Sequence, residues 1–200
     1  MYDERGIKDP LTGAYSRLFF DQRLHEELDR ASRYAANLTL FVLDIDHFKS
    51  INDAYGHMRG DEVLQQISDA INECIRVSDL FFRYGGDEFV LILPETSKQD
   101  SEKLALRMLD AIRTRRFSGN PPLQITISIG VASCPEEGAD PKVLFEAADR
   151  RLLEAKLQGR DRAVSDDLCH GDRAGDLELN RMIERDLEMK AVQDFLTALE

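Results

Sequence analysis

Four acidic residues stand where their side chains could do chemistry. Asp44 and Asp46 close an apolar segment that predicts a buried strand, and Asp87 and Glu88 directly follow two adjacent glycines. We expect Asp44 and Asp46 to point to opposite faces of their strand, and only one of Asp87 and Glu88 to face a shared site. Because neighbouring strands lie about 5 Å apart, one acid of each pair would then meet in one cleft.

Carboxylates that converge in this way suit a divalent cation. Hard oxygen ligands without a nearby His or Cys favour Mg²⁺ or Mn²⁺. The other interpretation is that acids at strand ends and turns are simply solvated. The residue types alone leave both interpretations open.

The glycine pair Gly85-Gly86 separates two β-prone segments, 79–84 and 87–93. This pattern predicts a hairpin whose turn needs positive φ at both glycines. The pair either makes the turn and nothing else, or also removes side chains so that a phosphate or a ribose can approach the backbone.

Three basic residues are candidates for binding a phosphate. They are Lys49, which follows Asp44 closely, and Lys156 and Arg160, which flank the end of a predicted helix. If a helix begins within 47–49, its first amides can donate to the same phosphate. The alternative for each cation is an ordinary solvated side chain, since exposed lysines and arginines are common on helices.

Helices and strands are predicted in mixed order around these residues. Apolar residues at three- and four-residue spacing predict helices, and short apolar or alternating segments predict strands. The predicted helices cover about 20–31, 60–75, 101–113 and 141–158, and the predicted strands cover 38–43, 79–84, 87–93 and 123–131. This order favours an α/β or α+β fold around a single sheet.

Composition excludes several classes of function. The 26 basic and 38 acidic residues give a net charge of −12, which disfavours a sequence-independent nucleic-acid binder. The apolar segments fall far below the roughly 18 residues that span a bilayer, and the first residues do not resemble a secretory signal. Three cysteines without CxxC spacing disfavour a disulfide framework and a zinc site, so we expect a cytoplasmic location.

The composition changes near the C-terminus. Residues 165–200 hold ten acidic and four basic side chains. Their first part predicts a linker, and the apolar spacing within 177–199 predicts a helix that contributes to dimerisation or to a partner contact. We therefore divide the chain into a domain at 1–164 and an acidic segment at 165–200.

The chain resembles the GGDEF domains, which are the diguanylate cyclases. The resemblance covers about 9–162 and rests on motifs that match in order and spacing, so it is specific. These motifs are DPLTG (9–13), DIDHFK (44–49), INDAYGH (51–57), GDEVL (60–64), RYGGDEF (83–89), ISIGV (127–131), and AAD (147–149) followed by AK (155–156) and GR (159–160).

The resemblance implies a fold related to nucleotidyl cyclases and polymerase palms, with a mostly antiparallel sheet and a hairpin that carries the GGDEF turn. It implies that two GTP are condensed to cyclic di-GMP with release of two pyrophosphates. Asp44, Asp87 and the carbonyl of Ile45 match the ligands of two Mg²⁺ (or Mn²⁺) ions. Such ions would bridge the triphosphate and lower the pKa of the ribose 3′-hydroxyl.

Further roles follow from the same resemblance. Glu88 matches the residue that assists deprotonation, and Asn52 and Asp61 match the guanine readers. The triphosphate contacts match Lys49, Lys156, Arg160 and the amides of His47 and Phe48, with Gly85 and Gly86 next to the substrate. We count Asp87, Glu88 and Lys49 as catalytic. Asp161 stands where Asn is usual, and we expect its charge beside Arg160 to weaken the grip on phosphate.

One domain holds one GTP, so the resemblance implies a homodimer as the catalyst. Arg76 and Asp79 match an RxxD site at which the product inhibits the enzyme, and Arg107 is expected to complete that site. A surface ion pair is the alternative reading of RxxD. The alternative for the whole chain is a non-catalytic module that senses GTP or cyclic di-GMP, although Asp87 and Glu88 are both retained.

Overall fold

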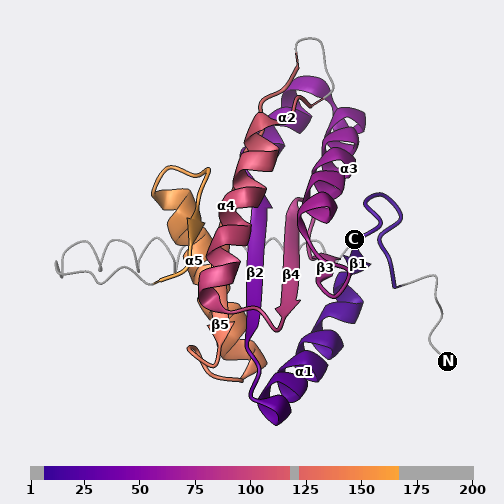
Figure 1. Cartoon of the computed structure of the whole chain (residues 1–200). Helices are drawn as coiled ribbons and strands as arrows, with labels where there is room; N and C mark the ends of the chain where they lie inside the picture. Colours follow the sequence, from indigo (N-terminus) through magenta and orange to yellow (C-terminus); the bar gives the residue numbers. More distant parts are fainter. Residues whose placement is uncertain (1–6, 118–121, 167–200) are drawn as a thin grey trace. The chain divides into compact units, whose positions relative to one another are not determined.

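The computed structural model describes residues 7–117 and 122–166 (Figure 1). Its helices and strands follow one another in mixed order, as the sequence predicts. They are β1 (Tyr15–Ser16), α1 (Arg17–Tyr34), β2 (Leu38–Ile45), α2 (Phe48–Tyr55), α3 (His57–Cys74), β3 (Leu80–Arg83), β4 (Glu88–Pro94), α4 (Lys98–Thr114), β5 (Ile127–Cys134), α5 (Pro141–Leu157) and β6 (Ala163–Val164). The helix predicted within 177–199 lies outside the described residues, and the boundary at 164 stays a prediction.

The strands form one six-stranded sheet in the order β1-β3-β4-β2-β5-β6. The central strand β2 is antiparallel to both β4 and β5, and β3 is antiparallel to β4. The short edge strands β1 and β6 pair in parallel with β3 and β5. The expectation of a single, mostly antiparallel sheet is confirmed.

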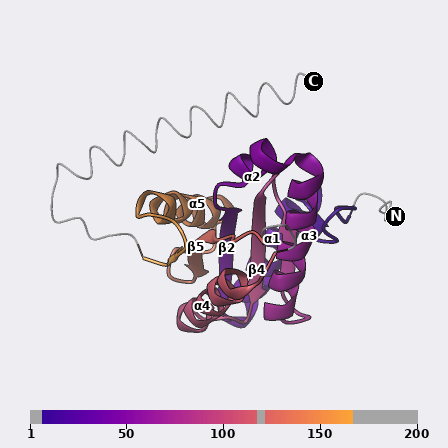
Figure 2. The ribbon, with the colours of Figure 1, turned by 90° about the horizontal axis from the view of Figure 1, so that it is seen from above.

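Helices cover both faces of the sheet, which explains why β2 is apolar along its length. Phe41, Leu43 and Ile45 pack in one core with residues of α3 and α4. Leu40 and Val42 point the other way and pack with residues of α1 and α5. Figure 1 shows α2 above the carboxyl end of β2, the end that Figure 2 views from above. Across the described ranges, no helix combines the length and apolarity that a bilayer crossing would need.

Several elements begin at other residues than predicted, and two of them show why. The helix expected from Gly60 begins at His57, after Gly56 with a φ of 81°. Gly60 instead lies buried inside α3, where an added Cβ would meet the Asn52 side chain at 2.0 Å. The strand expected from residue 123 begins at Ile127, because its partner β2 ends at the residue paired with Ile127.

The turn between β3 and β4 differs from the predicted one. The amides of Tyr84 and Gly85 both donate to the carbonyl of Glu88, at 2.9 and 3.1 Å. Neither Gly85 nor Gly86 is among the residues with positive φ, so that expectation is wrong. Because the turn spans 84–87 and not two residues, neither glycine has to adopt a left-handed conformation. At Gly85 the missing side chain matters for space, because a Cβ would lie 2.8 Å from Oε2 of Glu88.

Helix α5 packs directly on the backbone of β5 at Gly130. A Cβ there would lie 1.9 Å from the carbonyl oxygen of Ala148 and 2.3 Å from the amide nitrogen of Leu152. Both contacts are with backbone, so the helix itself would have to move. Close approach at Gly130 therefore sets the position of α5 and of the basic residues at its end.

Substitution Gly130→Ala is expected to destabilise the domain by about 2 kcal/mol, the usual cost of overpacking. Thermal unfolding should shift down by about 6 °C. The matched control is Gly86→Ala, because Gly86 also lacks positive φ and a Cβ there meets nothing within 4 Å. Equal melting temperatures of the two variants would contradict this packing argument.

Candidate active site

The two acidic turns of the sequence meet at one end of the sheet. Asp44 at the end of β2 pairs in register with Glu88 at the start of β4. The amide of Ile45 donates to the carbonyl of Asp87 at 3.3 Å. The antiparallel pairing of β2 and β4 thus brings Asp44, Ile45, Asp87 and Glu88 to one place.

Asp44 is the most strongly perturbed acid of this group. Burial, helped by the charges of Asp87 and Glu88, raises the pKa of its carboxyl group to about 7 against the attraction of Lys156. Its side chain is 13% exposed, and its Oδ2 lies 3.0 Å from Nζ of Lys156. Lys156 thus partly neutralises a carboxylate that the fold holds away from water.

Asp87 shares this environment. Burial raises the pKa of its carboxyl group, and the neighbouring charge of Glu88 acts in the same direction. A partly buried cluster of like charges with raised pKa values is typical of functional sites.

The donor set fits a divalent cation, because a cation would compensate the negative charge that burial and mutual repulsion make costly at Asp44 and Asp87. Throughout the described ranges, no group of three or more His, Cys, Asp or Glu side chains is arranged to hold a metal. The expected ligands do not need such a group, because they are two carboxylates and the main-chain carbonyl of Ile45. Asp44, Asp87 and that carbonyl are therefore the groups that would hold it.

Asp46 has a different role from Asp44. It is 4% exposed and accepts hydrogen bonds from the hydroxyls of Thr126 and Ser128, both at 2.7 Å, and from the amide of Asp161 at 3.1 Å. The expectation that Asp44 and Asp46 point to opposite faces is wrong, because residues two apart along a strand share a face. Asp46 lies with Asp44 on the α5 side of the sheet, and these hydrogen bonds engage both oxygens of its carboxylate.

Helix α2 begins within 47–49, where its first amides could donate to a phosphate. It starts at Phe48, and His47 before it has a φ of 59°. Phe48 is buried, whereas His47 and Lys49 are exposed at the end of the sheet that carries Asp44. The first turn of α2, which contains Lys49, thus follows directly after the strand end that carries Asp44.

Asn52 and Asp61 come together at the corner between α2 and α3. The Asn52 side chain lies against Gly60, next to the exposed Asp61. Its Oδ1 is buried and has no hydrogen-bond partner among the described residues. A buried carbonyl oxygen without a donor is costly, so this corner has an acceptor that a bound N–H donor would satisfy.

The RxxD residues lie in the turn after α3. The amide of Arg76 donates to Oδ2 of Asp79 at 2.7 Å, so the turn closes on the Asp side chain. Arg107 of α4 donates to the carbonyl of Cys74 at 2.6 Å, which brings it to the same turn. A cavity of about 270 Å³ beside this turn is lined in part by Arg76 and Asp79. The three sequence candidates therefore lie close together.

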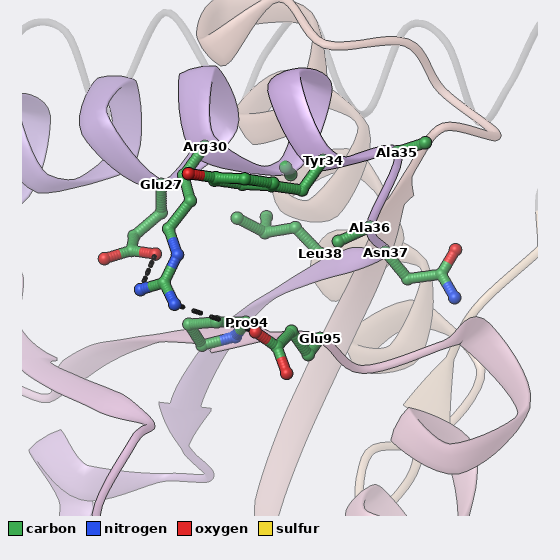
Figure 3. A pocket seen from close by; sticks show the side chains of 10 residues that line it. Glu27, Arg30, Tyr34, Ala35, Ala36, Asn37, Leu38, Pro94 and Glu95 are labelled. Atoms are coloured by element: carbon green, nitrogen blue, oxygen red, sulfur yellow. Dashed lines mark ion pairs between the residues drawn. The ribbon is translucent and has the colours of Figure 1, made fainter.

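A larger cavity, of about 510 Å³, lies at the end of β2 that is farther from Asp44 (Figure 3). Its lining includes Arg30, Tyr34 and Leu38, and Arg30 lies 3.7 Å from Glu95. Leu38 begins the strand that Asp44 nearly ends, so this cavity is separate from the acidic cluster. None of the expected site residues lines it.

Sequence reasoning missed one link at the site. Arg83 donates to both carboxylate oxygens of Asp9 at 3.2 Å and to the carbonyl of Gly86 at 2.8 Å. It therefore ties the turn at 9–13 to the turn that carries Asp87. Both residues lie within matched motifs, but nothing in their spacing signals that they pair.

Comparisons with known proteins show which proteins this chain resembles. The family described as "Diguanylate cyclase, GGDEF domain" matches residues 7–162. The diguanylate cyclase DgcP of Pseudomonas aeruginosa is 42% identical over 160 residues, which are 80% of this chain and 24% of DgcP. The response regulator PleD of Caulobacter vibrioides is 37% identical over 80% of this chain and 36% of PleD. The chain thus spans well under half the length of these relatives.

Solved structures show the same similarity. The diguanylate cyclase SiaD of Pseudomonas aeruginosa, in complex with its activator SiaC, has a TM-score of 0.77 and 39% identity over 82% of this chain and 63% of SiaD. The GGDEF domain of DgcB from Caulobacter crescentus, in complex with c-di-GMP, has a TM-score of 0.75 and 29% identity over 82% of this chain and 97% of that domain. The motifs, the fold and these matches agree, and the chain belongs to the GGDEF family of diguanylate cyclase domains.

Proposed function

We propose that this chain condenses two GTP molecules to cyclic di-GMP with release of two pyrophosphates. The observation that carries the proposal is the convergence of Asp44, Asp87 and Glu88 at one end of the sheet, with Lys156 3.0 Å from Asp44. In each half-reaction a ribose 3′-oxygen bonds to the α-phosphorus of the other GTP, and the bond to pyrophosphate breaks. A GTP substrate favours a cytoplasmic location. Cys74 and Cys134 favour it too, because both are buried and free.

The proposed site divides the work among separate parts of the chain. When bound, two Mg²⁺ (or Mn²⁺) ions would supply positive charge for the triphosphate and acidify the attacking 3′-hydroxyl. Asp44, Asp87 and the carbonyl of Ile45 would hold them. Glu88 would accept the proton of that hydroxyl, and the space above Gly85 accommodates its side chain.

Binding groups for the rest of the nucleotide surround this centre. Lys49, Lys156, Arg160 and the first amides of α2 would bind the triphosphate, next to Gly85 and Gly86. Asn52 and Asp61 would read guanine, because Asp61 can accept from N1–H and N2–H and the unpartnered Oδ1 of Asn52 needs a donor. Adenine lacks that pair of donors, so ATP would leave both acceptors unpaired.

The proposal requires a homodimer, since each domain would hold one of the two GTP molecules. Incubating the chain with GTP and Mg²⁺ and separating the products by chromatography tests it. Cyclic di-GMP and pyrophosphate in a ratio of 1:2 are expected, with a rate per chain that rises with protein concentration. Tight binding of GTP or cyclic di-GMP without any turnover would instead support the non-catalytic sensor.

We further propose that cyclic di-GMP inhibits the enzyme at Arg76, Asp79 and Arg107. Substitution Arg76→Ala removes the forked donor that would bind a phosphate or a guanine edge, so the concentration for half-inhibition should rise at least about tenfold. Initial rates at increasing product concentration measure this. The control is Arg33→Ala, an exposed arginine on α1. Unchanged inhibition in Arg76→Ala would refute the RxxD proposal and leave catalysis untouched.

A further inference from the structure

The segment that carries Arg160 has an unusual backbone. Gly159, Arg160 and Asp161 all have positive φ, at 106°, 64° and 50°. Glycine adopts this conformation at little cost, Asp tolerates it better than most residues, and for Arg it is uncommon. Two consecutive non-glycine residues in this conformation persist only where surrounding contacts hold them.

Contacts from three directions hold this segment. The amide of Arg160 donates to the carbonyl of Ala155 at 2.9 Å, and the amide of Asp161 donates to the buried Asp46 at 3.1 Å. From α4, Arg113 donates through Nε to Oδ2 of Asp161 at 2.9 Å and through Nη2 to the carbonyl of Asp161 at 3.4 Å. Arg113 therefore grips both the side chain and the backbone of one residue.

The partner of Asp161 differs from the one that the sequence suggested. We expected its charge to act on Arg160, yet its carboxylate forms an ion pair with Arg113. The other oxygen, Oδ1, is buried and has no partner among the described residues. Asp161 is therefore turned toward α4, and its charge is neutralised there instead of beside the phosphate-binding residue.

We propose that Arg113 and Asp161 are positioning residues that hold Arg160 ready to bind the triphosphate. This inference rests on the proposed function, because it takes Arg160 as a triphosphate ligand. The ion pair of Lys156 with Asp44 and the hydrogen bond from the amide of Asp161 to Asp46 tie both ends of segment 156–161 to the end of β2. Arg113 ties Asp161 to α4 as well, from the other side of the segment's last residue.

Substitution Arg113→Ala tests the proposal in the full chain. Arg113 is exposed, so its loss should leave the melting temperature nearly unchanged. The matched control is Arg116→Ala, which removes the same charge from an exposed position just beyond the end of α4. Hydrogen exchange at the amide of Asp161 should become at least about tenfold faster in Arg113→Ala and not in the control.

Nucleotide binding distinguishes the loss of a positioning contact at Arg160 from general damage to the site. Affinity for a non-hydrolysable GTP analogue should fall about tenfold in Arg113→Ala, whereas affinity for GMP, which lacks the β- and γ-phosphates, should hardly change. Asp161→Asn keeps an acceptor for Arg113 and should retain most of the affinity. Asp161→Ala should match Arg113→Ala, and the double variant should be no weaker than either.

Several results would overturn the proposal. Unchanged exchange at Asp161 would show that Arg113 does not hold the segment. Faster exchange with unchanged affinity for the GTP analogue, or equal losses for GMP and the analogue, would show that the contact does not position a triphosphate ligand. If the wild-type chain binds no GTP analogue, the proposed function fails, and the exchange result alone decides whether Arg113 holds the segment.

Discussion

Substitution Asp87→Asn is expected to lower the rate of cyclic di-GMP formation at least about a thousandfold, a loss of about 4 kcal/mol of transition-state stabilisation. Asn keeps the size of the side chain but removes the negative charge that would hold a divalent cation. The main-chain bond from Ile45 to Asp87 does not depend on this side chain, so the turn should keep its shape. Initial rates at saturating GTP and Mg²⁺ measure the effect.

The matched control is Asp29→Asn, an exposed position on α1. It changes the net charge equally and should leave the rate within about twofold, as expected for a surface substitution away from the site. Circular dichroism of both variants checks that the fold is intact. A folded Asp87→Asn protein with more than a tenth of the wild-type rate would show that Asp87 does not serve the proposed chemistry.

Substitution Asp44→Asn is expected to stabilise the metal-free domain while it abolishes activity. The folded state raises the pKa of Asp44 from its ordinary 3.8 to about 7. Above pH 7 the carboxylate is ionised in both states, and holding its charge in the fold costs about 4 kcal/mol. The pKa of about 7 already includes the attraction of Lys156, so we expect Asn to give a gain of about 4 kcal/mol at pH 8.

The sign of the pH dependence follows from the direction of the pKa shift. A carboxyl group with a raised pKa in the folded state destabilises the protein increasingly as the pH rises from about 4 to about 7. The gain from Asp44→Asn should therefore shrink to about 2 kcal/mol at pH 5. Urea unfolding at both pH values in the presence of a chelator measures it, with Asp29→Asn as control. A loss of stability at pH 8, or a gain that does not depend on pH, would contradict the electrostatic account of Asp44.

The sequence predicted most of the fold because its elements have clear local signals. The continuous apolar segment before Asp44 predicts a strand covered on both faces, and β2 is such a strand. The turn at Gly85-Gly86 was predicted less well, since glycine permits positive φ without requiring it. The residue at which β5 begins, Ile127, depends on where its partner β2 ends, which is information from elsewhere in the chain.

The candidate site could also be predicted only in part. Motif matches placed Asp44, Asp87 and Lys156 in one site, and the structure brings Asp44 within ion-pair distance of Lys156. Sequence reasoning missed the contacts of Asp46 and Arg113 with Asp161, because these residues lie on three separate elements. Pairing between distant elements leaves no local pattern in a single sequence, so tertiary structure was needed to find them.

The central claim is that Asp44 and Asp87 jointly hold the cations that act on GTP. Crystals of the chain grown with Mn²⁺ and a non-hydrolysable GTP analogue, measured at the manganese absorption edge, test it most directly. The account predicts anomalous density between the two carboxylates and the carbonyl of Ile45, in contact with the triphosphate. A bound analogue whose manganese lies elsewhere, with Asp44 still paired to Lys156, would contradict it.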